Sequence, residues 1–256
     1  MCGFFYGIIM NIIDVISLLN QMPTLYILGV EVIFCLALIS ICFRYTGLLG
    51  LYIYISIATI AANMAVLKTS LFPGYDSDIA LGTGIFTSIF LCNDIINEYY
   101  GKKSAIKAIL VGFFAYLAFL LMMFIVVAYS PVSASFESHK ALLHILNPAP
   151  AIFLASIVAY MCSQYLDLFL YRAIKNFTKN RFIAFRSFVS TAIGSFCDNV
   201  IFSLLAWYVF APEPLQLSKI WWTYIWGIYL MRLALSLLNA AYMPIINHLK
   251  PKNYDQ

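Results

Sequence analysis

The sequence predicts an all-α polytopic membrane protein. Of its 256 residues, 63% are hydrophobic and only 10% are charged, whereas soluble domains average about 25% charged residues. Apolar stretches that approach the roughly 20 residues needed to cross a hydrocarbon core recur along the whole chain. Because Lys and Arg in such a chain report membrane orientation, the net charge of +4 does not indicate a nucleic-acid partner, and we expect none.

The chain begins with a segment that predicts a helix lying in the membrane interface. In MCGFFYGIIMNIIDVISLLNQ, the polar residues Asn11, Asp14, Ser17 and Gln21 recur at steps of three or four among apolar residues. The segment lacks the basic start of a cleaved signal peptide, so we expect it to be retained.

Seven segments of transmembrane length follow, separated by turn clusters rich in Pro, Gly and Asp and by a short basic connector. They are residues 25–43, 47–67, 79–98, 104–129, 150–171, 186–210 and 221–246. The three histidines fall between or after these segments, where we expect loops or tails.

The basic residues predict how the chain is oriented. With the N-terminus placed outside, most Lys and Arg fall in inside segments, and the outside loops hold only Lys68, Lys140 and Lys219. The positive-inside bias therefore predicts a cytoplasmic C-terminus.

Several segments carry polar residues at steps of three or four, which places them on one helix face. These sets are Ser56, Thr59 and Asn63; Thr87, Asp94 and Glu98; Tyr160, Gln164, Asp167 and Tyr171; Ser187, Thr191, Gly194 and Asp198, with Ser190 and Ser195 alongside; and Trp226, Tyr229, Arg232, Ser236 and Asn239. Because an intramembrane charge costs at least about 2.5 to 3.5 kcal/mol, we expect these faces to converge on one shared cavity. A structural alternative stays open, in which hydroxyl and amide groups hold helices together and Asp198 with Arg232 forms a buried pair.

Motifs of common enzymes are absent. The chain has no HExxH, no G-x-S-x-G and no G-x-x-x-x-G-K-[ST], and its six cysteines are scattered without a CxxC. We therefore expect neither an enzyme nor a bound metal or cofactor. A channel and a membrane enzyme that uses intramembrane carboxylates, such as Asp94 with Asp167, stay open as alternatives, although no Gly-x-Gly-Asp motif surrounds either aspartate.

Four stretches together resemble the queuosine precursor transporter family of the vitamin uptake transporter group. They are NDIINEYYGKKSA at 93–105, SQYLDLFLYRAIKN at 163–176, RSFVSTAIGSFCDNVIFSLLAWY at 186–208 and the last segment with its arginine. The resemblance covers roughly residues 50–250. It implies a six-helix transporter core within residues 47–250, preceded by an extension, residues 1–46, that holds the amphipathic segment and one extra transmembrane helix.

The resemblance also implies uptake of a 7-deazaguanine for tRNA modification across the inner membrane of a bacterium. The precursor would be 7-cyano-7-deazaguanine, 7-aminomethyl-7-deazaguanine or queuine. Positions that match the family's motifs are Asn63, Asp94, Glu98, Gly101, Gln164, Asp167, Arg186, Ser190 and Asp198.

A deazaguanine presents adjacent N–H donors and a carbonyl acceptor, which suits a carboxylate paired with an amide. We expect Asp94 or Asp198 to accept from the donors and Asn63 or Gln164 to serve the carbonyl. The ring is expected to stack on Tyr160, Trp226 or Tyr229. Arg232 is expected to hold Asp198 ionised, which completes the predicted substrate-binding set: Asn63, Asp94, Glu98, Tyr160, Gln164, Asp167, Ser190, Asp198, Tyr229 and Arg232.

Two sources of energy for transport stay open. A stand-alone secondary transporter would couple uptake to protons at Asp94, Asp167 or Glu98, and we favour it. A substrate-binding subunit would instead dock on a separate ATPase, for which the small-residue pairs Ala58/Ala62 and Ala61/Ala65 are suited. The precursor, the coupling ion and the oligomeric state, a homodimer included, are not determined by the sequence.

Overall fold

The computed structural model describes residues 14–74, 79–146, 149–211 and 213–250, and this part of the chain is almost entirely helical. Residues 14–20 are helical, so the end of the expected interfacial segment is described, whereas residues 1–13 lie outside the described residues. The elements that follow are α2 (Thr24–Ile41), η1 (Cys42–Thr46), α3 (Gly47–Ala65), β1 (Thr69–Ser70), β2 (Ile79–Ala80), α4 (Thr83–Tyr99), α5 (Gly101–Ala128), η2 (Ser133–Ser135), α6 (Phe136–Leu146), α7 (Ala149–Phe177), α8 (Ile183–Leu204), η3 (Leu205–Val209), α9 (Leu217–Lys219), η4 (Ile220–Trp226), α10 (Gly227–Ile246) and η5 (Asn247–Leu249).

Five stretches of the described chain are long and apolar enough to cross a membrane. They are Thr24–Ala65, Gly101–Ala128, Ile152–Phe177, Ile183–Val209 and Leu217–Leu249. The predicted class, an all-α multi-pass membrane protein, agrees with this architecture. The division into a six-helix core, 47–250, and an N-terminal part, 1–46, stays a prediction.

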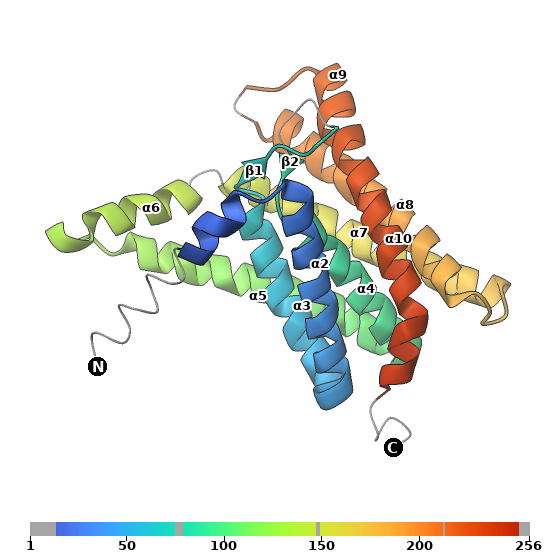
Figure 1. Ribbon diagram of the computed structural model, residues 1–256. Coiled ribbons are helices and arrows are strands. Elements are labelled where there is room, and N and C mark those ends of the chain that lie inside the picture. The colour runs from blue at the N-terminus through green and yellow to red at the C-terminus, as the bar shows by residue number, and fades with distance from the viewer. Residues whose placement is uncertain (1–13, 75–78, 147–148, 212, 251–256) are drawn as a thin grey trace.

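The first of these stretches contains two helices that run in opposite directions. Gly47 has a φ of +59°, which ends the π-helical turn η1 and starts α3 in a new direction. Thr24, at the start of α2, donates a hydrogen bond of 2.8 Å to the carbonyl of Leu71, which follows α3. The beginning of α2 and the end of α3 therefore lie at the same end of the bundle (Figure 1).

The helix α4 lies inside the bundle, in contact with α2, α3, α5, α7, α8 and α10. Every residue from 87 to 97 is buried. At 17 residues α4 is the shortest of the principal helices, and it carries both amide and carboxyl side chains. Its neighbours cover these groups, which is the only way that such a helix can be accommodated in lipid.

Two connections differ from the expected loops. The turn cluster after α3 contains an antiparallel hairpin in which Thr69 pairs with Ala80 and Ser70 with Ile79. The following helix was expected from residue 79 but begins at Thr83, because Gly82 has a φ of +87°. After α5, the amphipathic helix α6 projects beside the bundle (Figure 1) and holds two of the histidines expected in loops. An 11-residue helix is too short to register in a transmembrane-length window.

Close packing of α3, α5 and α7 depends on the absence of a side chain at Gly112. A Cβ atom there would overlap the Tyr160 hydroxyl and lie 3.0 Å from Ile55 and 3.1 Å from Thr59. We predict that Gly112→Ala lowers stability by about 1–3 kcal/mol, the usual cost of overpacking, seen as a lower melting temperature in detergent. Gly29→Ala is the matched control, since nothing lies within 4 Å of a Cβ atom there. Equal melting temperatures for the two variants would contradict this account of the packing.

Candidate functional site

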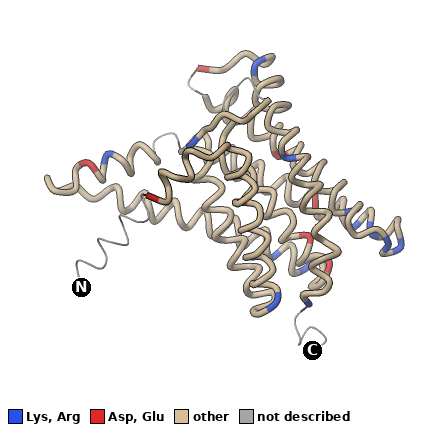
Figure 2. The backbone as a smooth tube through the Cα atoms, viewed as in Figure 1, with Lys and Arg blue, Asp and Glu red and all other residues tan. Residues whose placement is uncertain are grey.

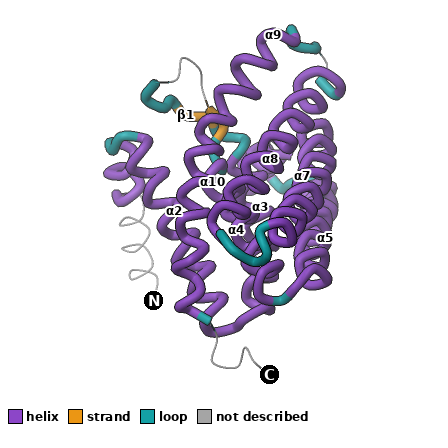
Figure 3. The backbone as a smooth tube through the Cα atoms, turned by 90° about the vertical axis from the view of Figure 1, so that its right-hand side faces the viewer, coloured by secondary structure: helices purple, strands orange, loops and turns teal. Residues whose placement is uncertain are grey.

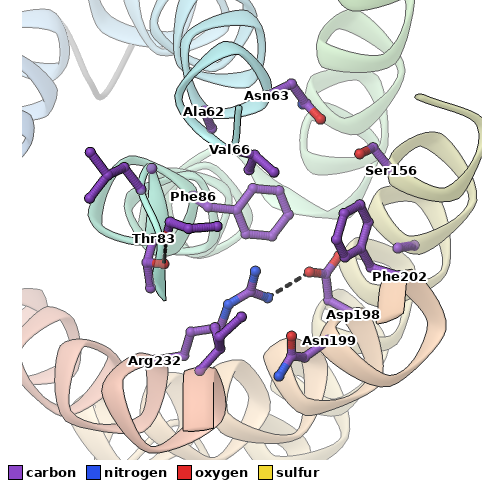
Figure 4. A pocket seen from close by; sticks show the side chains of 15 residues that line it. Ala62, Asn63, Val66, Thr83, Phe86, Ser156, Asp198, Asn199, Phe202 and Arg232 are labelled. Carbon is purple, nitrogen blue, oxygen red and sulfur yellow. Dashed lines mark hydrogen bonds and ion pairs between the residues drawn. The ribbon is translucent and has the colours of Figure 1, made fainter. Parts of the chain in front are cut away.

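A cavity lies between α3, α4, α7, α8 and α10, at the end of the bundle that carries the hairpin. Its volume is about 540 Å³ when the space that is open to solvent is included. Asn63 lines it from α3, Phe86 from α4, Asp198 and Phe202 from α8, and Arg232 from α10. Figure 4 shows the Arg232 guanidinium reaching across toward Asp198, with the Phe86 and Phe202 rings beside the contact. The cavity therefore combines apolar ring surface with one ion pair.

The ion pair in this cavity is the one anticipated from the sequence. Arg232 Nη1 lies 2.6 Å from Asp198 Oδ2, and the two side chains are 11% and 4% exposed. Ser163 on α7 donates to the other Asp198 oxygen at 3.2 Å. The guanidinium lies 5.0 Å above the Phe86 ring, a cation–π contact, while its Nε has no hydrogen-bond partner among the described residues. Arg232, which lines the cavity, thus carries a buried donor without a partner among the described residues.

The residue beside Asp198 fixes how α8 sits against the last helix. Asn199 donates to the carbonyl of Ile225 at 2.6 Å and lies 3.2 Å from that of Tyr224. Both acceptors belong to η4, where the wider π-helical turn leaves carbonyls available. This contact sets the position from which α10 presents Arg232 to Asp198.

A second polar group lies deeper, where α4, α7 and α8 meet. Asp94 and Asp167 are 1% and 0% exposed, and their carboxyl groups are within hydrogen-bonding reach of each other. Ser187 donates to Asp94 at 2.5 Å, and Thr191 donates to Asp167 at 3.3 Å. Gly194 permits the close approach of α7, because a Cβ atom there would lie 3.0 Å from the Asp167 Cβ. The stripe predicted on α8 therefore contacts carboxyl groups of two other helices.

Two amides adjoin the carboxyl pair. Asn93 Nδ2 donates to Gln164 Oε1 at 3.3 Å, while Asn93 Oδ1 and Gln164 Nε2 have no partner among the described residues. Ser190 reaches the Asp167 carboxyl and also donates to the Ser187 carbonyl at 3.3 Å. Gln164 and Ser190 thus belong to this second group and do not line the cavity.

A third polar group surrounds Glu98 at the other end of α4. The Glu98 carboxylate lies 2.6 Å from Arg186 and 2.9 Å from Lys175, and Tyr171 donates to it at 3.1 Å. Arg186 is only 1% exposed and its guanidinium lies 5.2 Å above the Tyr171 ring. Glu98 is therefore neutralised by two cations and does not face the cavity.

The two tyrosines of the predicted set lie away from the cavity. Tyr160 is buried between α5 and α7, where its hydroxyl donates to the Ile109 carbonyl at 3.4 Å. Tyr229 donates to the Ala192 carbonyl at 3.3 Å and packs against Phe196. Neither is among the residues that line the cavity.

The structure thus separates the predicted set into groups and adds residues that the sequence analysis missed. Asn63, Asp198 and Arg232 line the cavity, whereas the remaining members lie in the deeper groups or in helix contacts. Phe86 and Phe202 were missed because an apolar residue on an apolar helix carries no periodic signal. Arg186 was named as a family position at the start of the predicted segment 186–210, but it was left out of the predicted substrate-binding set and its partner Glu98 was not foreseen.

A second cavity adjoins the first and contains about 940 Å³, again counting open space. The two share the residues 80–83 that join β2 to α4. Its charged lining residues are Glu31 and Lys68, and Glu31 accepts a hydrogen bond of 2.9 Å from the backbone of Ile85 in the first turn of α4. The N-terminal helix α2 therefore helps to hold the wall between the cavities.

Comparison with known proteins agrees with this architecture. A family model described as "Putative vitamin uptake transporter" matches residues 80–246, which run from β2 to the end of α10. A "Probable queuosine precursor transporter" from Bacillus subtilis (strain 168) is 32% identical over 197 residues, or 77% of this chain and 82% of the relative. The chain belongs to the vitamin uptake transporter family, and it is similar to this queuosine precursor transporter. The family predicted from the four stretches is confirmed. No solved structure matches the chain.

The ion pair of the cavity generates a stability prediction. Arg232→Met leaves the Asp198 carboxylate buried without its cation, which costs about 3–5 kcal/mol, so we expect a strongly lowered melting temperature in detergent. The double variant Asp198→Asn/Arg232→Met should be more stable than Arg232→Met alone, because the two sites are coupled.

The control for this prediction is Lys140→Met. It breaks an ion pair with Glu137 in which the side chains are 57% and 86% exposed, and it should cost about 0–1 kcal/mol. Additive losses in the double variant would contradict a direct interaction between Asp198 and Arg232.

Proposed function

We propose that the protein takes up a 7-deazaguanine precursor of queuosine and binds it in the cavity at Asp198 and Arg232. The observation that carries this proposal is the buried ion pair with an unsatisfied donor, enclosed by Phe86 and Phe202. The family and the name of the similar Bacillus protein support it.

The chemistry of the cavity matches that of the proposed ligand. The adjacent N–H donors of the pyrimidine edge are suited to the Asp198 carboxylate, and the ring carbonyl is suited to the free Arg232 Nε. The flat heterocycle would stack on Phe86 or Phe202, in place of the tyrosines expected from the sequence. Asn63 uses its amide nitrogen on the Thr59 carbonyl at 2.8 Å, so its oxygen remains to accept from a ligand.

We place the protein in the inner membrane of a bacterium with the C-terminus in the cytoplasm. Two connections lie beside the end of the described chain. Arg44 in η1 donates to the Lys250 carbonyl at 2.7 Å, and Tyr99 at the end of α4 donates to Asn247 at 2.8 Å. Figure 2 shows Lys and Arg at the same end as the C-terminus and along the connection between α7 and α8. The positive-inside bias favours the cytoplasm for this end.

We further propose that the protein works as a stand-alone secondary transporter. The pair Ala58/Ala62, which was considered for docking on an ATPase, is buried in this chain at 4% and 1% exposure. In Figure 3 the helices form a bundle, in which α3 contacts α4 and α5, and α4 in turn contacts α7 and α8. Internal packing accounts for Ala58 and Ala62, whereas the second pair, Ala61/Ala65, is only half-buried, so one of the two alanine pairs no longer argues for an energising partner.

Uptake by the purified protein in liposomes tests the proposed function. We predict that the wild type exchanges labelled for unlabelled 7-cyano-7-deazaguanine or 7-aminomethyl-7-deazaguanine without any partner. Asp198→Asn should weaken binding by about tenfold to a few hundredfold, because charge-assisted hydrogen bonds contribute about 1.5–3 kcal/mol. Lys140→Ala, on the exposed helix α6, is the control and should match the wild type.

Two results would count against the proposal. Absence of binding and exchange for every deazaguanine tested would refute the transport function. Normal binding by a folded Asp198→Asn variant would place the substrate site elsewhere in the protein.

A further inference from the structure

Four carboxyl groups lie on the inner faces of α4, α7 and α8, and only two of them are neutralised by cations. Asp198 forms an ion pair with Arg232, and Glu98 forms ion pairs with two cations. Asp94 and Asp167 form no ion pair with any described residue, although both are completely enclosed. Two ionised carboxylates in contact inside a membrane would carry a large electrostatic cost, so this pair needs a different source of positive charge.

The geometry of the pair indicates what that source is. One Asp94 oxygen accepts from Ser187 and one Asp167 oxygen accepts from Thr191. The second Asp167 oxygen, Oδ2, is buried and has no hydrogen-bond donor among the described residues. The two carboxyl groups are nevertheless within hydrogen-bonding reach of each other, and a hydrogen bond between carboxyl groups requires that one of them carry a proton.

We propose that Asp94 and Asp167 form the proton-binding site that couples uptake to the proton gradient. This inference rests on the proposed transport function. In the step itself, a hydronium ion gives its proton to Asp94, an O–H bond forms, and water leaves. The new O–H donates to Asp167, whose Oδ2 has no other donor among the described residues, and the proton returns to water on the cytoplasmic side.

The groups around the pair do not offer a competing partner. Besides the pair itself, the charged side chains on α4 and on the helices that pack against it are Glu98 on α4, Arg172 and Lys175 on α7, Arg186 and Asp198 on α8, Arg232 on α10, Glu31 on α2, and Lys102, Lys103 and Lys107 on α5. Arg186 and Lys175 are held by Glu98, Arg232 is held by Asp198, and Arg172 donates to the Asn97 side chain at 3.2 Å. Glu31 accepts from the start of α4, and the three lysines of α5 are exposed. Tyr171 donates to Glu98. No cation among these forms an ion pair with Asp94 or Asp167.

The carboxyl pair lies between the substrate cavity and the Glu98 group, which is the position that a coupling site requires. On its cavity side, Ser163 links α7 to Asp198, and the Gln164 amide nitrogen has no hydrogen-bond partner in the described part of the chain. On its other side, the Asn97 amide nitrogen, next to the Glu98 group, likewise has no partner among the described residues. Polar atoms therefore continue from the substrate cavity through the pair toward the basic end, along the contact between α4, α7 and α8.

Proton-driven accumulation of 7-cyano-7-deazaguanine in liposomes tests the coupling. If one proton enters with each neutral substrate molecule, a pH gradient of about one unit sustains a roughly tenfold accumulation of substrate. The gradient supplies about 1.4 kcal/mol per proton, which corresponds to a tenfold concentration ratio. Asp167→Asn and Asp94→Asn keep the size of the side chain but remove the titrating group. We predict that each variant retains exchange of labelled for unlabelled substrate and loses accumulation driven by the pH gradient.

The controls separate this inference from the proposed function. Glu137→Gln removes an exposed carboxylate on α6 and should accumulate substrate as the wild type does. Asp198→Asn should lose both exchange and accumulation, because it changes the substrate cavity. Accumulation that persists in Asp167→Asn and Asp94→Asn, or that follows a sodium gradient and ignores pH, would overturn the proton site while leaving transport intact.

Infrared spectroscopy provides a readout that does not depend on the substrate. The wild type should show the C=O band of a protonated, buried carboxyl group near neutral pH, and this band should disappear in Asp94→Asn and persist in Glu137→Gln. Wild-type protein without such a band would refute the shared proton even if every deazaguanine failed to bind.

Discussion

The need to neutralise every buried charge organises this protein. Lipid offers no water to compensate an ionised side chain, so each one must find a cation, a proton or several donors within the bundle. The inner helices meet this need at three levels along α4: Arg232 with Asp198 near the hairpin, hydroxyl groups with the carboxyl pair in the middle, and two cations with Glu98 at the basic end.

Periodicity in the sequence predicts well which helix faces point inward. Residues three or four positions apart share one face of a helix, whichever helix lies next to it. The faces of α7 and α8 are buried as that spacing predicts, including Gln164, Asp167, Thr191 and Asp198. Sequence alone does not determine which face meets which. The expected single pocket was therefore too simple, because the same stripe on α8 contacts Asp167 through Thr191 and contacts Arg232 through Asp198, two turns further on.

Partners that lie far apart in the chain account for what the sequence analysis missed. Arg186 belongs to a run of basic residues, and only the fold reveals that it is enclosed by Glu98 and the Tyr171 ring. The aromatic walls of the cavity are phenylalanines whose inward orientation depends on how α4 and α8 rotate. Contacts of this kind are set by tertiary packing, which local patterns do not encode.

The ion pair in the cavity has a consequence for selectivity under the proposed function. A ligand that approaches Asp198 must replace part of its contact with Arg232, and the two charges remain buried while it does so. Only a ligand with donors for the carboxylate and an acceptor for the guanidinium compensates both at once. A purine analogue without the carbonyl would leave Arg232 Nε unsatisfied, and unmatched buried groups reject analogues strongly. Under the proposed function, the pair that joins α8 to α10 would therefore also distinguish a guanine-like edge from other flat rings.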